Sequence, residues 1–167
     1  RGRIGPWVLG AAGLVLPLLF SSGCGTLRAA NPEVRIIAFG DSSTEGPAER
    51  DYAYYLRRAL GLEAEAIAKE GEGGEETDQG VRRLGAMLAG EWFPNAQVLI
   101  FWEGGADVVE FIEVNDRLLL EDPDAAGYDL AAALDRKLDN IESNLTEAVN
   151  RAQGAGLEVY LVTYFHL

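Results

Sequence analysis

Apolar residues in this chain follow two kinds of pattern, which together predict strands alternating with helices. Short apolar runs rich in β-branched and aromatic residues, or runs of alternating apolar and polar residues, are typical of strands. They occupy residues 34–39, 62–71, 96–105 and 157–165. Apolar positions three or four residues apart predict amphipathic helices, and these cover residues 48–61, 77–89 and 128–153. Strands that alternate with helices form a parallel sheet with helices on both faces.

The predicted helices differ in the strength of their apolar stripe. The clearest stripe lies in residues 128–153 and consists of Leu130, Leu134, Leu138, Ile141, Leu145, Val149 and Ala152. The helix at 48–61 presents a face formed by Tyr52, Tyr55, Leu56, Ala59 and Leu60. Residues 107–128 predict a short helix followed by an irregular loop around Pro123. With 167 residues, the chain is long enough for one domain with a core and hardly for two.

The first residues have the pattern of a targeting segment. Arg1 and Arg3 precede an apolar run at residues 7–20, which is shorter than the ~20 residues of a membrane-spanning helix. The small residues before Cys24 resemble a bacterial lipoprotein signal, in which the cysteine becomes the lipidated first residue. Ser21 departs from that pattern, where leucine is usual, so an ordinary secretory leader stays open. We therefore expect a signal peptide at 1–23, a linker at 24–33, a folded domain at 34–167, and an exported protein anchored by lipid in the bacterial envelope.

Composition and charge exclude several classes of function. The chain has 14 Lys and Arg against 27 Asp and Glu, a net charge of −13, which repels nucleic-acid backbones. A single cysteine excludes an internal disulfide, and a single histidine, His166, excludes the Cys/His clusters that bind zinc.

Glycine and small polar residues gather where the predicted strands end. The sequences at these points are GDSSTEG, KEGEGGEET, EGGAD and FHL. In open parallel sheets, ligands bind at the carboxyl ends of the strands. We therefore expect a site at this edge, with backbone close to its ligand.

The first of these sequences resembles a known signature. FGDSSTEG, residues 39–46, resembles the first block of the SGNH (GDSL-type) hydrolases, which are esterases and acyl-transfer enzymes on a flavodoxin-like α/β sheet. The resemblance implies that Ser42, after Gly40, is the nucleophile and that its backbone N–H is one oxyanion donor. It also implies that Asp41 braces the turn through hydrogen bonds. From composition alone, a serine that only caps a helix is the alternative.

Two further blocks extend the resemblance over about residues 34–165. EGEGGEET, residues 70–77, resembles the second block, with Gly71 at its earlier glycine and Gly74 supplying the second oxyanion N–H. Residues 98–112 resemble the third block, whose core is Gly-x-Asn-Asp; the preferred register starts it at Gly104 and ends it at Asp107. That register leaves Ala106 at the asparagine, and the other register puts Asp107 there. Neither supplies a side-chain amide.

The family's general base is absent from its expected motif. The family takes this base from an Asp-x-x-His block after a fifth strand, but Thr163 stands three residues before His166. His166 follows the fourth predicted strand, in a different element, and a satisfied or exposed histidine is the alternative to a base there. No helix follows to cover that strand. We therefore expect an N-terminal portion of a longer hydrolase, with the final strand and helix missing and the base beyond Leu167.

Other features of the site edge have less specific interpretations. A phosphate loop is excluded because Glu75 and Glu76 stand where Gly-Lys-Ser/Thr would follow the glycines. Trp92, Phe93 and Trp102 are predicted to pack in the interior. The acids near the second block are predicted to form a solvated face, and they lack an EF-hand pattern for calcium; they are Glu70, Glu72, Glu75, Glu76 and Asp78.

The resemblance implies an ester hydrolase, lipase-like or deacetylase, that forms an acyl-enzyme on Ser42. It implies no metal or organic cofactor. The expected partners are small-molecule, glycan or lipid esters, with the membrane contacted through the lipid anchor, and the chain is expected to be monomeric. The alternative is an inactive envelope lipoprotein that uses the fold to bind glycans or proteins, because Ala106 and the missing base both remove catalytic groups.

Overall fold

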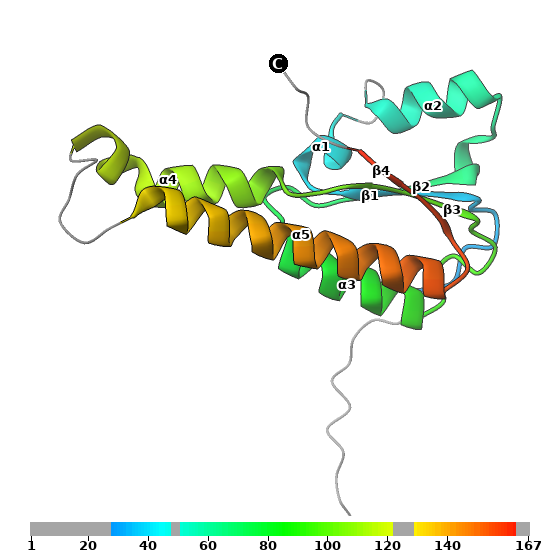
Figure 1. Cartoon of the computed structure of the whole chain (residues 1–167). Helices are drawn as coiled ribbons and strands as arrows, with labels where there is room; N and C mark the ends of the chain where they lie inside the picture. The colour runs from blue at the N-terminus through cyan, green and yellow to red at the C-terminus, as the bar shows by residue number, and fades with distance from the viewer. Residues whose placement is uncertain (1–27, 48–50, 122–128, 163–167) are drawn as a thin grey trace, which may run out of the picture.

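Four parallel strands form the centre of the molecule (Figure 1). The computed structural model describes residues 28–47, 51–121 and 129–162. The strands are β1 (Ile36–Gly40), β2 (Ile67–Gly71), β3 (Val98–Trp102) and β4 (Glu158–Leu161), in the order β2-β1-β3-β4. Gly40 pairs with Gly71 on one side and with Trp102 on the other, so three carboxyl ends meet at one edge.

Helices cover both faces of this sheet (Figure 1). Helix α2 (Tyr52–Leu60) lies on one face, and α3 (Thr77–Ala89) and α5 (Leu130–Gly154) lie on the other. The four-residue helix α1 (Ser42–Glu45) follows β1 directly, and α4 (Gly105–Glu121) follows β3. This arrangement confirms the predicted α/β fold with a parallel sheet between helices.

The core lies between the sheet and the α3–α5 layer. Phe39 and Phe101 stack with ring centroids 5.5 Å apart, and Leu84 of α3 is fully buried. Ala148 and Ala152 of α5 are also fully buried, and their small side chains let α5 approach the core closely. These residues belong to one contiguous hydrophobic cluster, which fixes the sheet and thereby its carboxyl edge.

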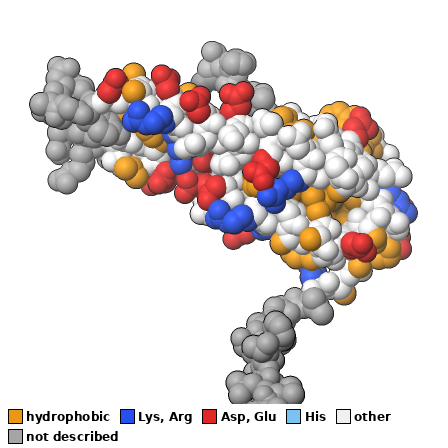
Figure 2. Space-filling view, turned by 60° about the horizontal axis from the view of Figure 1, so that its bottom comes forward, with side chains coloured by type: hydrophobic (Ala, Val, Ile, Leu, Met, Phe, Trp, Pro, Cys, Tyr) orange, Lys and Arg blue, Asp and Glu red, His pale blue; other side chains and the backbone are white. Residues whose placement is uncertain are grey.

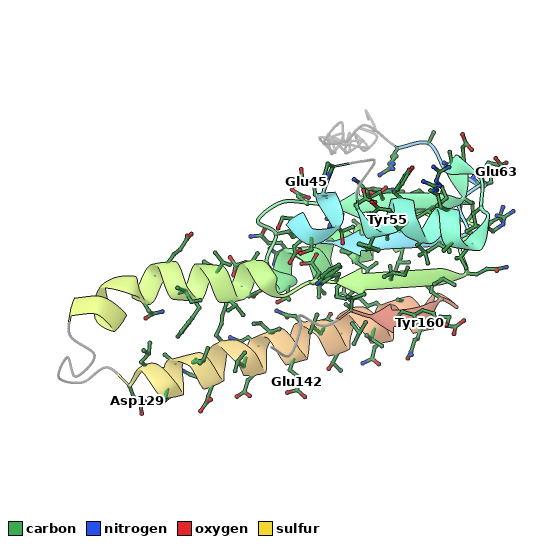
Figure 3. The ribbon with its side chains drawn as sticks, turned by 90° about the horizontal axis from the view of Figure 1, so that it is seen from above. Glu45, Tyr55, Glu63, Asp129, Glu142 and Tyr160 are labelled. Atoms are coloured by element: carbon green, nitrogen blue, oxygen red, sulfur yellow. The ribbon has the colours of Figure 1, made fainter. Side chains whose placement is uncertain are left out.

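Helix α4 is longer than its sequence pattern predicts. It runs to Glu121 rather than ending early, so the prediction of a short helix followed by a loop was wrong for residues up to 121. No glycine or proline interrupts residues 106–122, and the Asn115 amide donates to the carbonyl of Phe111 one turn earlier. Figures 1 and 3 show α4 and α5 running side by side away from the sheet.

Two other sequence predictions need correction. Residues 62–71 do not form one strand, because Ala64–Ala66 make a 3₁₀ turn (η1) before β2; alanine and glutamate there favour helical conformations over a strand. The apolar faces predicted for the helices are also only partly buried. Tyr55 and Leu60 of α2 and Leu134 and Leu138 of α5 are exposed.

The N-terminal predictions fall outside the described residues. Residues 1–23 and Cys24 belong to the part that the structure does not describe, as do Thr163 and His166. In the described ranges, no helix is both long and apolar enough to cross a membrane. The signal peptide, the lipid anchor and the missing final elements stay predictions.

Candidate active site

The turn after β1 holds Ser42 at the carboxyl edge of the sheet. The Asp41 backbone N–H donates to the carbonyl of Trp102 at the end of β3 (3.1 Å). The buried Asp41 carboxylate accepts from the Ser43 N–H (2.8 Å) and thereby caps α1. Only glycine fits at position 40, because the Cβ of any other residue would overlap the Trp102 carbonyl. Ser42 follows this fixed turn and is exposed.

The loop after β2 passes directly beside Ser42. At Gly71 a Cβ would overlap the backbone of Glu45 in α1, so only glycine lets the two segments touch. A Cβ at Gly73 would lie 4.0 Å from the Cβ of Ser42. Gly74 has a φ of +76°, a conformation that favours glycine. The loop that contains Ser42 and the loop that contains Gly74, which the sequence blocks predict to form one site, therefore lie side by side in the fold.

Ser42 and Gly74 line one cavity of about 750 Å³. Ala106 of α4 lines it as well, and its methyl group offers no hydrogen-bond donor. Val108 and Val109, both exposed, form an apolar part of the wall. The remaining lining residues are polar, acidic or glycine: Asp41, Ser43, Glu76, Gly105, Glu110 and Glu113.

Asp107 is buried beneath the cavity rather than lining it. Its carboxylate accepts from the backbone N–H of Thr77 (2.7 Å) and from the Thr77 hydroxyl (3.2 Å). The Asn144 amide of α5 donates to the same hydroxyl (3.0 Å). Asp107 thus ties the start of α3 to α4, and Gly104, with a φ of +106°, makes the turn that brings it there.

Lys137 of α5 adds a cation behind this wall. Its amino group lies 2.7 Å from Glu76, 3.0 Å from Glu110 and 3.4 Å from Asp107. Burial lowers the pKa of Lys137, but hydrogen bonds to Glu76 and Glu110 outweigh this and hold it above its ordinary value. Figure 2 shows acidic side chains gathered with a few basic ones at the end of the molecule where α4 and α5 lie.

The predicted solvated face of acids is wrong for two residues. Glu75 is buried and bonded by Arg83 through both carboxylate oxygens. Glu70 has a mostly buried side chain that accepts from the Arg28 guanidinium at 2.7 and 2.8 Å. Sequence reasoning missed both arginines and Lys137, because periodicity alone does not show which cation reaches which carboxylate. An arginine eight residues after Glu75, two turns into the next helix, was the available signal.

Tyr52 supports the turn that holds Ser42 from the α2 side. Its hydroxyl oxygen lies 3.2 Å from Oγ1 of the fully buried Thr44 in α1. Burial raises the pKa of Tyr52 to about 12, so the phenol stays neutral at physiological pH. Its ring packs at a tilt against Trp102, with centroids 5.5 Å apart.

The described residues supply no general base for Ser42. Within the described ranges, no side chain accepts a hydrogen bond from the Ser42 hydroxyl, and the Asp41 carboxylate is directed at the Ser43 N–H. The single histidine, His166, lies outside those ranges. The described residues therefore present an exposed serine beside a glycine-bearing loop.

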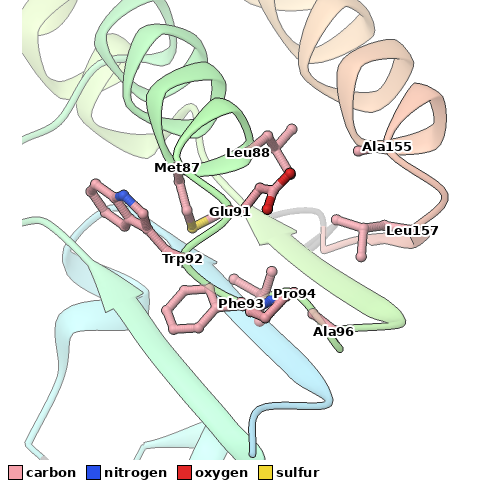
Figure 4. Close-up of a pocket in the computed structure, with 10 residues that line it drawn as sticks. Met87, Leu88, Glu91, Trp92, Phe93, Pro94, Ala96, Ala155 and Leu157 are labelled. Carbon is pink, nitrogen blue, oxygen red and sulfur yellow. The ribbon is translucent and has the colours of Figure 1, made fainter. Parts of the chain in front are cut away.

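A second cavity lies at the opposite end of the strands (Figure 4). It measures about 370 Å³ and is lined mainly by apolar side chains, including Met87, Trp92, Phe93 and Leu157. Phe93 is buried and the side chain of Trp92 packs against the core cluster, as predicted for both. Glu91 is the one ionisable residue in this lining, so this cavity lacks a nucleophile and is not the candidate active site.

Solved structures share this architecture. The chain matches AlinE4, an SGNH-hydrolase family esterase, with 21% identity and a TM-score of 0.51, over 77% of this chain and 58% of that one. It matches a putative lipolytic protein of the G-D-S-L family from Desulfitobacterium hafniense with 14% identity and a TM-score of 0.52, over the same shares. The chain has the fold of the SGNH hydrolases.

This chain matches only part of each of these structures. The chain spans a little over half the length of both structures, 58%. No protein-family model matches the sequence, and no curated protein matches it. The likeness therefore establishes the SGNH fold alone.

Replacing Asp107 by alanine should destabilise the protein by about 1–3 kcal/mol, because the buried Thr77 N–H loses its acceptor. Chemical denaturation of full-length protein measures this change. Asp135→Ala, at an exposed position on α5, is the matched control and should change the free energy of unfolding by less than about 0.5 kcal/mol. Equal effects of the two substitutions would contradict the role assigned to Asp107.

Proposed function

We propose that this protein is a serine ester hydrolase that forms an acyl-enzyme on Ser42. The observation that carries the proposal is the position of Ser42, exposed at a cavity that it shares with Gly74. The fixed turn before it and the close glycine-bearing loop beside it are what a nucleophile with backbone oxyanion donors requires. Two of the similar structures, an esterase and a putative lipolytic protein, support the same class of reaction.

In the proposed reaction, the Ser42 hydroxyl attacks the carbonyl carbon of an ester. A base removes the hydroxyl proton, and the backbone N–H groups of Ser42 and Gly74 bind the oxyanion. The base then returns the proton to the leaving alcohol, and water releases the acyl group by the same steps in reverse. We assign the base to a histidine outside the described residues.

The cavity wall favours particular esters. Val108 and Val109 offer an apolar surface to an acyl chain, while Glu110 and Glu113 lie in the same lining. Carboxylates at the rim repel anionic substrates. We therefore propose uncharged or positively charged esters with an apolar acyl group as substrates, presented to an exported, lipid-anchored enzyme.

A binding protein without catalysis is the second candidate function. Ala106 favours it, because its methyl group lines the cavity where a third oxyanion donor would stand. Loss of one such donor lowers the rate by about 100- to 1,000-fold in comparable sites. In that case the same cavity would hold an ester or a glycan without cleaving it.

Ser42→Ala should abolish hydrolysis of short-chain aryl esters by the full-length protein, because the acyl-enzyme can no longer form. Steady-state assays of purified protein measure the loss, which should exceed about 1,000-fold in kcat. Ser143→Ala, on an exposed position of α5, is the control and should keep the activity of the unaltered protein. Equal turnover with and without the Ser42 hydroxyl would show that Ser42 is not the nucleophile, and no turnover by the unaltered protein would support the binding function instead.

Ala106→Asn should raise kcat for the same esters by up to about 100-fold, because it adds an amide donor to the cavity wall. Ala106→Val, which enlarges the side chain without adding a donor, separates this effect from a change in cavity shape. The gain should appear in kcat more than in KM, since the donor acts on the oxyanion. An unchanged or lower kcat for the asparagine variant would show that position 106 does not face the oxyanion.

A further inference from the structure

A buried carboxyl group without a hydrogen-bond donor lies beneath the candidate active site. Glu103 directly follows β3, and the residue is 4% exposed. In the described part of the chain, no donor reaches either of its carboxyl oxygens. An ionised carboxylate in such a position would lose its hydration without replacement, which is unfavourable by several kcal/mol. The side chain therefore needs another way to be accommodated.

The charged neighbours of Glu103 do not balance a second anion. The carboxylate of Glu75 already pairs with Arg83, so these two groups neutralise each other. Asp41 of the nucleophile turn adds a further buried negative charge, and Glu72 lies 3.4 Å from the same guanidinium on its exposed side. One arginine thus stands among four carboxyl groups, and ionisation of Glu103 would leave an unpaired charge.

Gly80 of α3 makes the room that this side chain occupies. A Cβ at Gly80 would lie 2.9 Å from Oε1 of Glu103 and 3.6 Å from Oε2 of Glu75. The two carboxyl groups therefore approach each other over a glycine in the first turns of α3. Burial, the adjacent Glu75 carboxyl group and the charge of Asp41 raise the pKa of Glu103 to about 10, although Arg83 opposes the shift.

We propose that Glu103 is a positioning residue, which stays protonated and donates a hydrogen bond to Glu75, thereby fixing the loop that contains Gly74. Only a protonated carboxyl can donate to another carboxylate. Glu75 keeps lone pairs for this bond while it accepts from Arg83. The consequence for catalysis rests on the proposed function, but the protonation and the loop position do not.

Arg83 carries the effect of Glu103 to the sheet edge. Its guanidinium donates to the carbonyl of Gly40 at the end of β1 (3.3 Å) and of Glu70 in β2 (3.2 Å). Glu75 is the residue after Gly74, so a shift of its side chain would move the glycine N–H that we propose as an oxyanion donor. A neutral Glu103 holds Glu75 on one side while Arg83 holds it on the other.

The protonation is tested by unfolding the full-length protein across pH 5 to 9. A folded-state pKa above the unfolded value of 4.5 means that the unfolded chain releases the Glu103 proton first, so stability falls as pH rises towards 10. Glu103→Gln removes this pH-dependent contribution to stability while keeping a neutral hydrogen-bond donor. The folding equilibrium constant of the unaltered protein should fall relative to that of E103Q by up to about tenfold per pH unit.

Glu72→Gln is the matched control, because Glu72 meets the same arginine but is 64% exposed at its side chain. It should leave the pH dependence of stability unchanged. Infrared difference spectra between the unaltered protein and E103Q at pH 7 should show the carbonyl stretch of a protonated carboxyl. Parallel pH profiles for the unaltered protein and E103Q, or a carboxylate signal alone, would overturn the proposal.

The positioning role is tested separately with Glu103→Leu, which removes the donor. The amide resonance of Gly74 should move in E103L and stay near its original position in E103Q, whether or not the protein hydrolyses esters. If turnover is present, E103L should lower kcat about tenfold or more with little change in KM. An unmoved Gly74 resonance in a folded E103L would overturn the positioning role. If the unaltered protein shows no turnover but the Gly74 resonance still moves in E103L, the result would count against the proposed function and not against the positioning role.

Discussion

The carboxyl edge of this sheet depends on the contacts of the Arg83 guanidinium. The guanidinium stacks over the ring of Phe39, 3.9 Å from its centroid, and donates to carbonyls at the ends of β1 and β2. Its ion pair with Glu75 holds the next loop against the same edge. Burial lowers the pKa of Arg83, but the hydrogen bond and charge of Glu75 outweigh this and raise it above its ordinary value. Arg83 therefore stays a cation, and its hydrogen bonds are charge-assisted.

Close backbone contacts then determine what surrounds Ser42. Gly40 and Gly71 lie where any Cβ would overlap neighbouring backbone, so the end of β1 can approach the Trp102 carbonyl of β3 and α1 can approach β2. Asp107 secures the start of α3 through Thr77. The serine is therefore held by packing and hydrogen bonds that form before any ligand binds, which is the preorganisation that oxyanion stabilisation needs.

The sequence predicted the fold well because its signals are local. Helix α3 begins and ends at the predicted residues, 77 and 89, and β1 ends at Gly40, one residue beyond the predicted strand at 34–39. Polar partners separated along the chain were not predictable in this way. Glu75 reads as one acid among five in the sequence, and its burial depends on Arg83. Glu103 reads as a strand-end acid, and only the packing of α3 at Gly80 shows how close it lies to Glu75. The base for Ser42 stays a prediction.

Covalent labelling shows directly whether Ser42 is an activated nucleophile. Full-length protein is treated with an alkyl fluorophosphonate, whose phosphorus forms a bond to a reactive serine oxygen as fluoride leaves. Peptide mass spectrometry then locates the adduct. We predict a single adduct on the peptide containing Ser42. Protein that hydrolyses esters but carries the adduct on another serine, or remains unlabelled, would contradict it.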